Sequence, residues 1–576
     1  MNKIKQLRKL MKIHNIDGYI VPKNDEYFGE YIDKSKERLK FVSSFSGSAG
    51  IGLIFKKKCY IFVDGRYTIQ AKKEVNKPFK VVEIHKTKPK KVLNSFKKKI
   101  TIGFDPRLHT ELNLKNLYKL KKITLKPIGY NLIDKIWKNK PNLKNKKFYL
   151  LKLKEVGTSH KTKINKVIQK IKKYKADKIL ITASENIAWL LNIRGHDSDF
   201  SPIPNCNLIL DKNGNMDLIV PKSKIDLKFL KFFGKKLNIV TPEKFHSHIN
   251  KYDSKNKIVI DSLTCSFFYR KILLNKFKLI EKIDPIYLFK SIKNKKEIDN
   301  IKKIHILDGA ALTKFIIWVK NNYLKKNITE LSAANKLESF RKFFKDYKFP
   351  SFNTISATGS NGAIIHYKPT SKSNKRLQKG DLYLVDSGGQ YHYGTTDVTR
   401  TIPLGNQNEK IKEIFTKVLK CHIAVVNYKL KKNTTGSIID KVARRPLLKM
   451  GLNYQHGTGH GVGYFLNVHE GPQAISYGNK INIKKGMIIS NEPGYYLENK
   501  FGIRIENLIY VSTFGQNLLR FKNLTYAPID PEMVKIDFLN NEERKYIKNY
   551  NFKTLKKINP FLNYKEKSWY KENFLF

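Results

Sequence analysis

The stretch LYLVDSGGQYHYGTTDVTRT, residues 382–401, contains two β-rich runs around Gly-Gly and Tyr-Gly turns. This alternation of strand-forming and turn-forming residues is typical of antiparallel hairpins. The two runs carry Asp386 and Asp397, and two later stretches of the same style carry Glu492 and Glu506. If one sheet assembles these strands, it presents four carboxylates together.

Four converging carboxylates repel one another and raise one another's pKa, so such a site requires cations. The segment HGTGHGVG, residues 456–463, adds His456 and His460. One imidazole with four carboxylates suits a pair of divalent ions, manganese or cobalt more than a thiolate-type zinc site. Two ions about 3.5 to 4 Å apart can share a water, lower its pKa and polarise a peptide carbonyl. The pattern favours peptide hydrolysis, and no Gly-x-Ser-x-Gly elbow competes with it.

Each of these residues also has an ordinary structural interpretation. Asp386 at a strand end can be a turn former or cap, His460 between glycines can belong to a surface loop, and Glu492 precedes a Pro-Gly turn. Glu506 is more suggestive, because it interrupts an apolar strand pattern in which an unpaired charge would be costly. Spacing alone leaves both interpretations open.

The composition indicates a globular protein of several domains. The chain has 576 residues, 41% of them hydrophobic and 12% aromatic, and one hydrophobic core rarely organises so long a chain. The net charge of +65, from 113 Lys and Arg against 48 Asp and Glu, would ordinarily indicate nucleic acid or an anionic membrane as a partner. Because the lysines are scattered through every segment and no nucleic-acid-binding motif is present, we favour solvated lysine faces.

The cysteines and the N-terminus predict a cytoplasmic location. The four cysteines lie far apart in the sequence, which argues against a Cys-x-x-Cys metal site and a dense disulfide framework; they are Cys59, Cys206, Cys265 and Cys421. Residues 1–22 lack the continuous apolar core of a signal peptide. No run approaches the roughly 18 apolar residues of a membrane span.

Two segments of similar plan precede the hairpin-rich region. Each opens with an amphipathic helix that leads into a strand, and each later contains a short strand ending in an aspartate, Asp105 or Asp261. We infer a weak internal duplication of an α/β domain. A last helix is predicted at 541–550. The predicted domains are 1–150 and 151–292, which are the two related domains, 293–515, which is hairpin-rich, and 516–576, a basic and aromatic extension.

The order of the candidate ligands resembles that of the pita-bread metallopeptidases, which include methionine aminopeptidase, prolidase, aminopeptidase P and creatinase. All five ligand positions match: Asp386 in LVDSGGQY, Asp397 in GTTDVTRT, His460 in HGTGHGVG, Glu492 in SNEPGYY and Glu506 in GIRIENL. The closer resemblance is to the long, three-domain Xaa-Pro aminopeptidases, and it covers nearly the whole chain. Its blocks are DEYFGEYI at 25–32, RLKFVSSFSGSAG at 38–50, VDGRYTIQA at 63–71, IAWLLNIRG at 187–195 and SFNTISATGSNGAIIHYKPT at 351–370.

The resemblance implies an α/β (α+β) architecture with two creatinase-N-like domains followed by a pita-bread catalytic domain. It implies two divalent ions per subunit, Mn²⁺ first, with Co²⁺ or Zn²⁺ as alternatives. Asp397 and Glu506 would bridge the ions. Asp386 would complete the ligands of one ion, and His460 and Glu492 would complete those of the other.

The same resemblance implies further catalytic residues. Glu492 is expected to act as acid or base for the bridging water. The expected active-site histidines, which line the proline pocket and assist the scissile amide, are His366, His456 and His469. Tyr496 and Arg504 are expected to support them, with Arg504 orienting a carboxylate through its planar fork. SDFSPIPN at 198–205 is less typical of the family, so distal peptide subsites are expected to differ.

The implied activity is hydrolysis of the N-terminal Xaa-Pro bond of peptides, releasing one amino acid, by a homodimer with no membrane or nucleic-acid partner. A prolidase-type Xaa-Pro dipeptidase is the alternative enzyme, and creatinase is disfavoured because its metal-ligand set differs. The fold also serves as a metal-free binding module for ribosomes or nucleic acid. A retired enzyme of that kind would be expected to have lost some of the five ligands.

Overall fold

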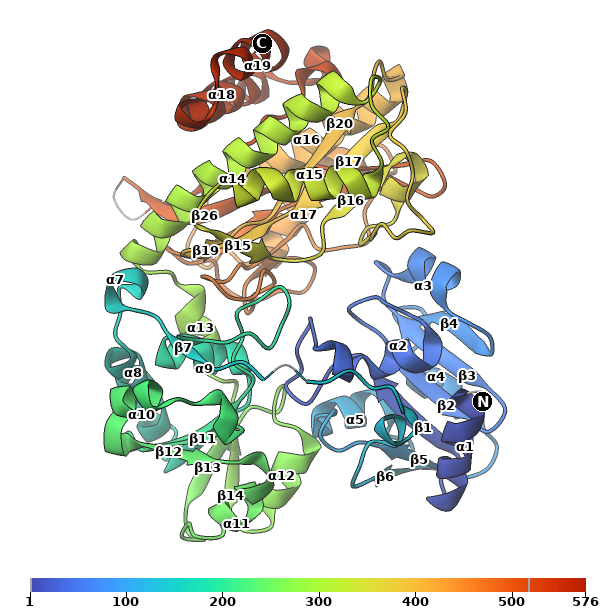
Figure 1. Ribbon diagram of the computed structural model, residues 1–576, viewed down its shortest axis with the longest axis vertical. Helices are drawn as coiled ribbons and strands as arrows, with labels where there is room; N and C mark the ends of the chain where they lie inside the picture. Colours follow the sequence, from blue (N-terminus) through green and yellow to red (C-terminus); the bar gives the residue numbers. More distant parts are fainter. Residues whose placement is uncertain (1–2, 144, 516–517, 576) are drawn as a thin grey trace. The chain divides into compact units, whose positions relative to one another are not determined.

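The computed structural model describes residues 3–143, 145–515 and 518–575. The chain divides into two compact units, Met1–Ile286 and Tyr287–Phe576, coloured blue to green and green to red in Figure 1. Every predicted metal ligand and catalytic residue lies in the second unit. None of the described helices combines the length and apolarity needed to cross a membrane.

The first unit contains two six-stranded sheets with the same internal order. The orders are β4-β3-β2-β1-β5-β6 and β12-β11-β10-β8-β13-β14. In both sheets a central strand, β1 or β8, pairs antiparallel with one neighbour and parallel with the other. The shared pattern confirms the predicted duplication. The strands are β1 Gly18–Pro22, β2 Ile51–Phe55, β3 Cys59–Val63, β4 Phe79–Glu83, β5 Ile100–Phe104 and β6 Ile123–Pro127, then β8 Lys178–Ile181, β10 Asn207–Asp211, β11 Met216–Ile219, β12 Leu237–Val240, β13 Lys257–Ile260 and β14 Lys278–Glu281.

Amphipathic helices open both halves, as predicted. Helix α1, Lys3–Ile13, buries Ile4, Leu7 and Met11, and α8, His160–Lys173, buries Ile164, Val167 and Ile171 among others. These spacings of three and four residues put the apolar side chains on one helix face. The other helices of this unit are α2 Arg38–Ser43, α3 Thr68–Glu74, α4 Pro89–Asn94, α5 Glu111–Tyr118, α6 Leu132–Ile136, α7 Leu153–Val156, α9 Ser184–Leu191, α10 Leu227–Phe233, α11 Phe245–Ile249 and α12 Phe267–Leu274, and a short pair of strands is β7 Tyr149–Leu150 and β9 Ile193–Arg194.

The two aspartates that end equivalent strands make equivalent contacts. Asp105, after β5, accepts a hydrogen bond at Oδ1 from the backbone N–H of Arg107 and one at Oδ2 from Asn131 Nδ2. Asp261, after β13, accepts at Oδ1 from the N–H of Leu263 and at Oδ2 from the N–H of Asp284. Each carboxylate thus caps its own turn and ties it to the chain that follows the neighbouring strand.

The second unit combines long helices with short antiparallel sheets, as Figure 1 shows. Its longest helix, α14, begins with a capping box in which Asn294 and Glu297 satisfy each other's backbone N–H groups. The helices are α13 Ile286–Ser291, α14 Lys295–Asn322, α15 Glu330–Lys342, α16 Glu409–Val426, α17 Gly436–Leu448, α18 Asn541–Ile558 and α19 Tyr564–Phe574, with a 3-10 turn, η5, at Gly359–Ala363. The strands are β15 Tyr347–Pro350, β16 Ile355–Thr358, β17 Leu382–Ser387, β18 Gly389–Tyr391, β19 Gly394–Thr395, β20 Val398–Pro403, β21 Gly459–His460, β22 Ala474–Ile475, β23 Ile488–Asn491, β24 Gly494–Leu497, β25 Phe501–Arg504, β26 Asn507–Phe514 and β27 Leu518–Asn523.

The C-terminal helices belong to the core of this unit. Helix α18 confirms the helix predicted at 541–550 and continues to Ile558, whereas α19 was not predicted. Tyr570 and Phe574 of α19 are buried in the same cluster as Phe315 of α14. The capping box at Asn563 and Glu566 is the sequence signal that would have identified α19.

Candidate metal centre

Strand register brings three of the predicted carboxylates to one end of a sheet. Strands β17 and β20 pair antiparallel with Asp386 opposite Thr399, and Asp397 directly precedes β20. The backbone N–H of Glu506 donates to the carbonyl of Thr399 at 3.2 Å. Glu506 therefore falls at the break between β25 and β26, which explains why it interrupts an apolar pattern in the sequence.

Asp397, His460 and Glu506 form a tight cluster of potential metal ligands. One side-chain atom from each lies within 4.8 Å of the other two. His460 Nε2 is 3.4 Å from Asp397 Oδ2 and 3.6 Å from Glu492 Oε1. Glu492 directly follows β23, and its N–H donates to the carbonyl of Thr458. The structure thus places Glu492 beside this cluster.

The ring orientation of His460 suits metal coordination. Its Nδ1 lies 2.9 Å from the carbonyl oxygen of Gly461, and because a carbonyl only accepts, Nδ1 carries the proton that is donated. The lone pair of a neutral ring is then on Nε2, the nitrogen that faces Asp397 and Glu492. A backbone acceptor commonly fixes the tautomer of a ligating histidine in this way.

The electrostatics of the cluster call for positive charge. Burial, followed by the charges of Asp397, Glu492 and Asp386, raises the pKa of Glu506 well above its usual value. Burial also raises the pKa of Asp386 to about 7, with Arg504 opposing and Asp397 adding to the rise. Asp386 Oδ1 is buried without a hydrogen-bond partner among the described residues. Unmatched carboxylate oxygens with one imidazole are a donor set that fits divalent cations.

Arg504 connects the cluster to its surroundings. Its guanidinium is buried and donates to Asp386 Oδ2 at 2.6 Å, to Tyr496 Oη at 2.6 Å and to Thr399 Oγ1 at 3.1 Å. Thr399 in turn donates to Glu506 Oε2 at 2.7 Å. The predicted contact between Arg504 and a carboxylate is therefore present, and it involves Asp386.

A directed hydrogen-bond chain runs from Arg504 through Tyr496 to His456. The Nδ1–H of His456 donates to the carbonyl of Gly457 at 2.8 Å, so its Nε2 accepts the Tyr496 hydroxyl at 2.9 Å. Burial lowers the pKa of His456 to about 4, although Glu492 opposes this effect. The imidazole is therefore neutral near pH 7, as this bonding pattern requires.

The other predicted catalytic residues border the same region. The ring of His469 lies 4.3 Å from that of His460, in an edge-to-face arrangement. His366 follows η5, and Arg504 Nη2 is 3.5 Å from the carbonyl of the preceding residue, Ile365. Burial alone would raise the pKa of Glu492, but His460, His456, Arg504 and His469 together bring it below its usual value, which favours the ionised carboxylate.

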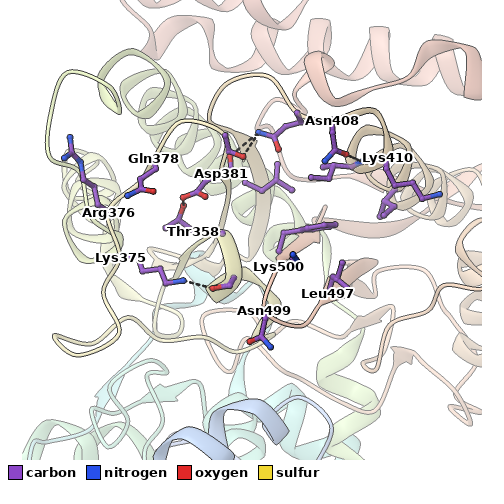
Figure 2. Close-up of a pocket in the computed structure, with 18 residues that line it drawn as sticks. Thr358, Lys375, Arg376, Gln378, Asp381, Asn408, Lys410, Leu497, Asn499 and Lys500 are labelled. Carbon is purple, nitrogen blue, oxygen red and sulfur yellow. Dashed lines mark hydrogen bonds between the residues drawn. The ribbon is translucent and has the colours of Figure 1, made fainter.

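A cavity of about 730 Å³ elsewhere in this unit does not include the predicted residues. Figure 2 shows polar residues on its wall, among them Thr358, Lys375 and Lys500. No predicted ligand or catalytic residue lines it. Its wall nevertheless includes residues of η5 and of the turn between β24 and β25, elements that also lead to the cluster.

Sequence reasoning missed Thr399, which supports Glu506. A threonine within a strand carries no chemical signal by itself. Its spacing of two residues from Asp397, on the same face of an extended chain, is the only sequence hint. The contact depends on the approach of β25 to β20, which the sequence pattern does not define.

Comparisons with known proteins match this organisation. Residues 299–513 match the family described as Metallopeptidase family M24. Two matches described as Creatinase/Prolidase N-terminal domain cover residues 3–136 and 139–297, and residues 517–574 match the C-terminal region of peptidase_M24. These matches confirm the predicted fold class.

Relatives resemble the chain over almost its whole length. A probable Xaa-Pro aminopeptidase P of Laccaria bicolor is 36% identical over 97% of this chain and 90% of its own. Xaa-Pro aminopeptidase 1 of Dictyostelium discoideum is 36% identical, with 99% and 95% covered.

Solved structures give the same result. The X-prolyl aminopeptidase of Caenorhabditis elegans, described as a cytosolic enzyme with a di-nuclear active site, aligns with a TM-score of 0.92 at 29% identity, covering 99% of this chain and 98% of its own. A prolidase from Thermococcus sibiricus aligns with a TM-score of 0.53 at 27% identity, covering 65% of this chain and 98% of its own. The chain therefore belongs to metallopeptidase family M24, and its similarity to Xaa-Pro aminopeptidases extends over nearly its whole length.

Proposed function

We propose that this protein is a two-metal aminopeptidase that hydrolyses the N-terminal Xaa-Pro bond of peptides and releases one amino acid. The observation that carries the proposal is the convergence of Asp397, His460 and Glu506 within 4.8 Å, with Asp386 and Glu492 beside them. Relatives that align over almost the whole chain are named for this activity.

The residues would divide the work as the family resemblance implies. Asp397 and Glu506 would hold both ions, Asp386 one of them, and His460 and Glu492 the other. When bound, two divalent ions would supply Lewis acidity and lower the pKa of a water between them toward neutrality. Glu492, whose pKa is lowered, would accept a proton from the attacking water and return it to the leaving amine.

The chain's other groups would position the substrate. His366, His456 and His469 would line the proline pocket, with His456 kept neutral by burial and oriented by Tyr496. Both ring nitrogens of His456 are already bonded, to the Gly457 carbonyl and the Tyr496 hydroxyl, so the neutral ring would line the pocket without adding charge to it. Arg504 would hold Asp386 in place.

The decisive experiment uses metal-stripped protein and a short Xaa-Pro-Xaa peptide, with and without Mn²⁺. Release of only the first residue, dependent on metal and lost in Asp397→Asn, is the expected result. Parallel samples with Co²⁺ and Zn²⁺ identify the preferred ion, for which we propose Mn²⁺. A metal-loaded protein that leaves the peptide intact would contradict the proposal.

An Xaa-Pro dipeptide tests the alternative of a prolidase. The prolidase of Thermococcus sibiricus aligns with only 65% of this chain. The additional part of this chain supports a substrate range that differs from that of a prolidase. We expect tripeptides and longer peptides to be cleaved at least as well as the dipeptide. Cleavage restricted to the dipeptide would favour the prolidase.

We further propose a cytoplasmic homodimer that engages neither membranes nor nucleic acid. Light scattering after gel filtration tests the dimer. Retention on a polyanion column that persists in about 0.15 M salt would instead favour a nucleic-acid partner for the +65 chain.

A further inference from the structure

Glu330 is a buried carboxylate outside the predicted site. It is the first residue of α15 and is 0% exposed. Among the described residues it forms no salt bridge, and instead it accepts hydrogen bonds from four groups. These are the N–H of Thr358 at 2.8 Å, Asn361 Nδ2 at 3.0 Å, the Tyr367 hydroxyl at 2.7 Å and the N–H of Lys375 at 3.0 Å.

The four donors all belong to one segment, residues 358–375, which we call the η5 segment. Thr358 and Lys375 lie at its two ends, and Figure 2 shows both on the wall of the same cavity. The backbone adds a reciprocal bond at one end, because the N–H of Glu330 donates to the carbonyl of Lys375 at 2.9 Å. A single carboxylate therefore closes this loop and also contacts its interior at Asn361 and Tyr367.

This arrangement requires a carboxylate rather than a polar side chain in general. A carboxylate offers acceptor sites on both oxygens, whereas a glutamine amide replaces one oxygen with a donor. In a glutamine, an amide nitrogen in place of Oε2 could not accept the hydrogen bonds that the Tyr367 hydroxyl and the Lys375 N–H donate. Burial raises the pKa of Glu330 and the four donors oppose that rise, as expected where hydrogen bonds stabilise the charged form.

The η5 segment is packed directly against the strand that carries Arg504. A Cβ atom placed on Gly502 would lie 1.8 Å from the carbonyl oxygen of Gly362, so the two backbones touch. Arg504 follows two residues later in β25, and its Nη2 is 3.5 Å from the carbonyl of Ile365. The position of the η5 segment therefore constrains the strand whose guanidinium donates to Asp386.

We infer that Glu330 is a positioning residue for the metal centre. By fixing the η5 segment it sets both His366, within that segment, and Arg504, which the segment contacts. The inference extends the proposed function and rests on it for the catalytic readout. Its structural part, the order of the η5 segment and of β25, does not depend on which peptide is cleaved.

The test compares Glu330→Gln with Ser356→Ala. Ser356 is an equally buried neighbour whose hydroxyl bonds the backbone carbonyl of Glu330 rather than the carboxylate. Tyr367→Phe serves as a milder variant, because it removes one donor and keeps the carboxylate. Hydrogen exchange of residues 358–375 and 501–505, bound-metal content, and kcat and KM per folded molecule are measured for each protein.

We expect amide exchange in both regions to accelerate about tenfold or more in Glu330→Gln, and kcat/KM to fall by a similar factor while metal content stays at the wild-type level. Tyr367→Phe should change the same regions by a smaller factor, and Ser356→Ala should change exchange and kcat/KM less than about twofold. A merely structural role would lower the folded fraction and leave kcat/KM per folded molecule unchanged.

Unchanged exchange in the η5 segment, or faster exchange with an unchanged kcat/KM, would overturn the inference. So would equal effects of Ser356→Ala and Glu330→Gln. If wild-type protein cleaves no Xaa-Pro peptide, the proposed function fails, and exchange at 501–505 still decides whether Glu330 controls the Arg504 strand.

Discussion

Arg504 Nη2 donates a 2.6 Å hydrogen bond to Asp386 Oδ2, with both side chains buried. The other oxygen of Asp386 has no hydrogen-bond partner among the described residues. The guanidinium therefore restrains one carboxylate oxygen and leaves the other without a hydrogen bond among the described residues. This division allows one aspartate to be held in place and still serve as a ligand.

Replacing Arg504 with lysine should lower kcat/KM by about a hundredfold. A lysine keeps the charge but cannot donate in three fixed directions, to Asp386, Tyr496 and Thr399, at once. Steady-state kinetics on an Xaa-Pro-Xaa peptide measure the effect. Arg520→Lys, at an exposed position of β27, is the matched control, and equal activity of the two variants would contradict this role.

Adding Mn²⁺ to metal-stripped protein should raise its melting temperature. A ligand that binds only the folded state stabilises it by about 2.7 kcal/mol at a free concentration of 100 Kd, and the cation also relieves the repulsion between Glu506 and its neighbours. Asp397→Asn should lose most of this shift. Differential scanning fluorimetry compares it with Asp299→Asn, an exposed aspartate of the same unit, which should retain the full shift.

Acid should destabilise the protein partly through His305. Its Nδ1–H donates to Ile301, its Nε2 is buried without a partner among the described residues, and burial lowers its pKa to about 4. An unfolded histidine has a pKa of about 6.5, so between pH 6.5 and 4 the unfolded state binds more protons and stability falls as pH falls. The slope approaches about 1.4 kcal/mol per pH unit for this one group.

The pH effect is measured by denaturant unfolding at several pH values. His305→Gln cannot titrate and should show a shallower loss of stability between pH 6.5 and 4. His85→Gln, at an exposed position, should keep the wild-type slope. Parallel profiles for wild type and His305→Gln would exclude His305 as a contributor.

Glu470→Gln should destabilise the second unit more than Lys293→Met. Glu470 pairs with Lys293 at 2.6 Å and with Lys290 at 3.3 Å, and all three side chains are buried. Removing the carboxylate leaves two buried cations without a counter-ion, at a cost of about 3 to 5 kcal/mol. Removing Lys293 leaves the ion pair between Lys290 and Glu470, whose net charge is zero. Urea unfolding measures the order, and a larger loss in Lys293→Met would disprove this charge balance.

The candidate metal ligands were more predictable from the sequence than the residues that hold them in place. Carboxylates and histidines within hairpin motifs can be recognised from residue type, so the sequence predicts Asp397, His460 and Glu506 among a larger set of candidates, and the family resemblance selects the five ligands. Thr399 and Glu330 could not be identified, because their contacts join segments 107 and 28 residues away. Such contacts depend on how strands and turns approach one another, which local patterns do not encode.

Features of the fold were likewise predictable where a local pattern marks them and unpredictable where they depend on distant contacts. The repeated strand that ends in aspartate, at Asp105 and Asp261, revealed the duplication, since a local signal recurred in each half. Helix α19 was missed because lysines interrupt its apolar pattern, and its burial depends on α14, more than 240 residues earlier in the sequence.

Asp105 and Asp261 give each sheet of the first unit its own fastening point. In each sheet the carboxylate joins the chain after one strand to the chain after the neighbouring strand, but the first bonds an asparagine side chain and the second a backbone amide. A side-chain substitution at Asn131 can therefore remove the first fastening, whereas the second is completed by a backbone group that every residue type except proline supplies.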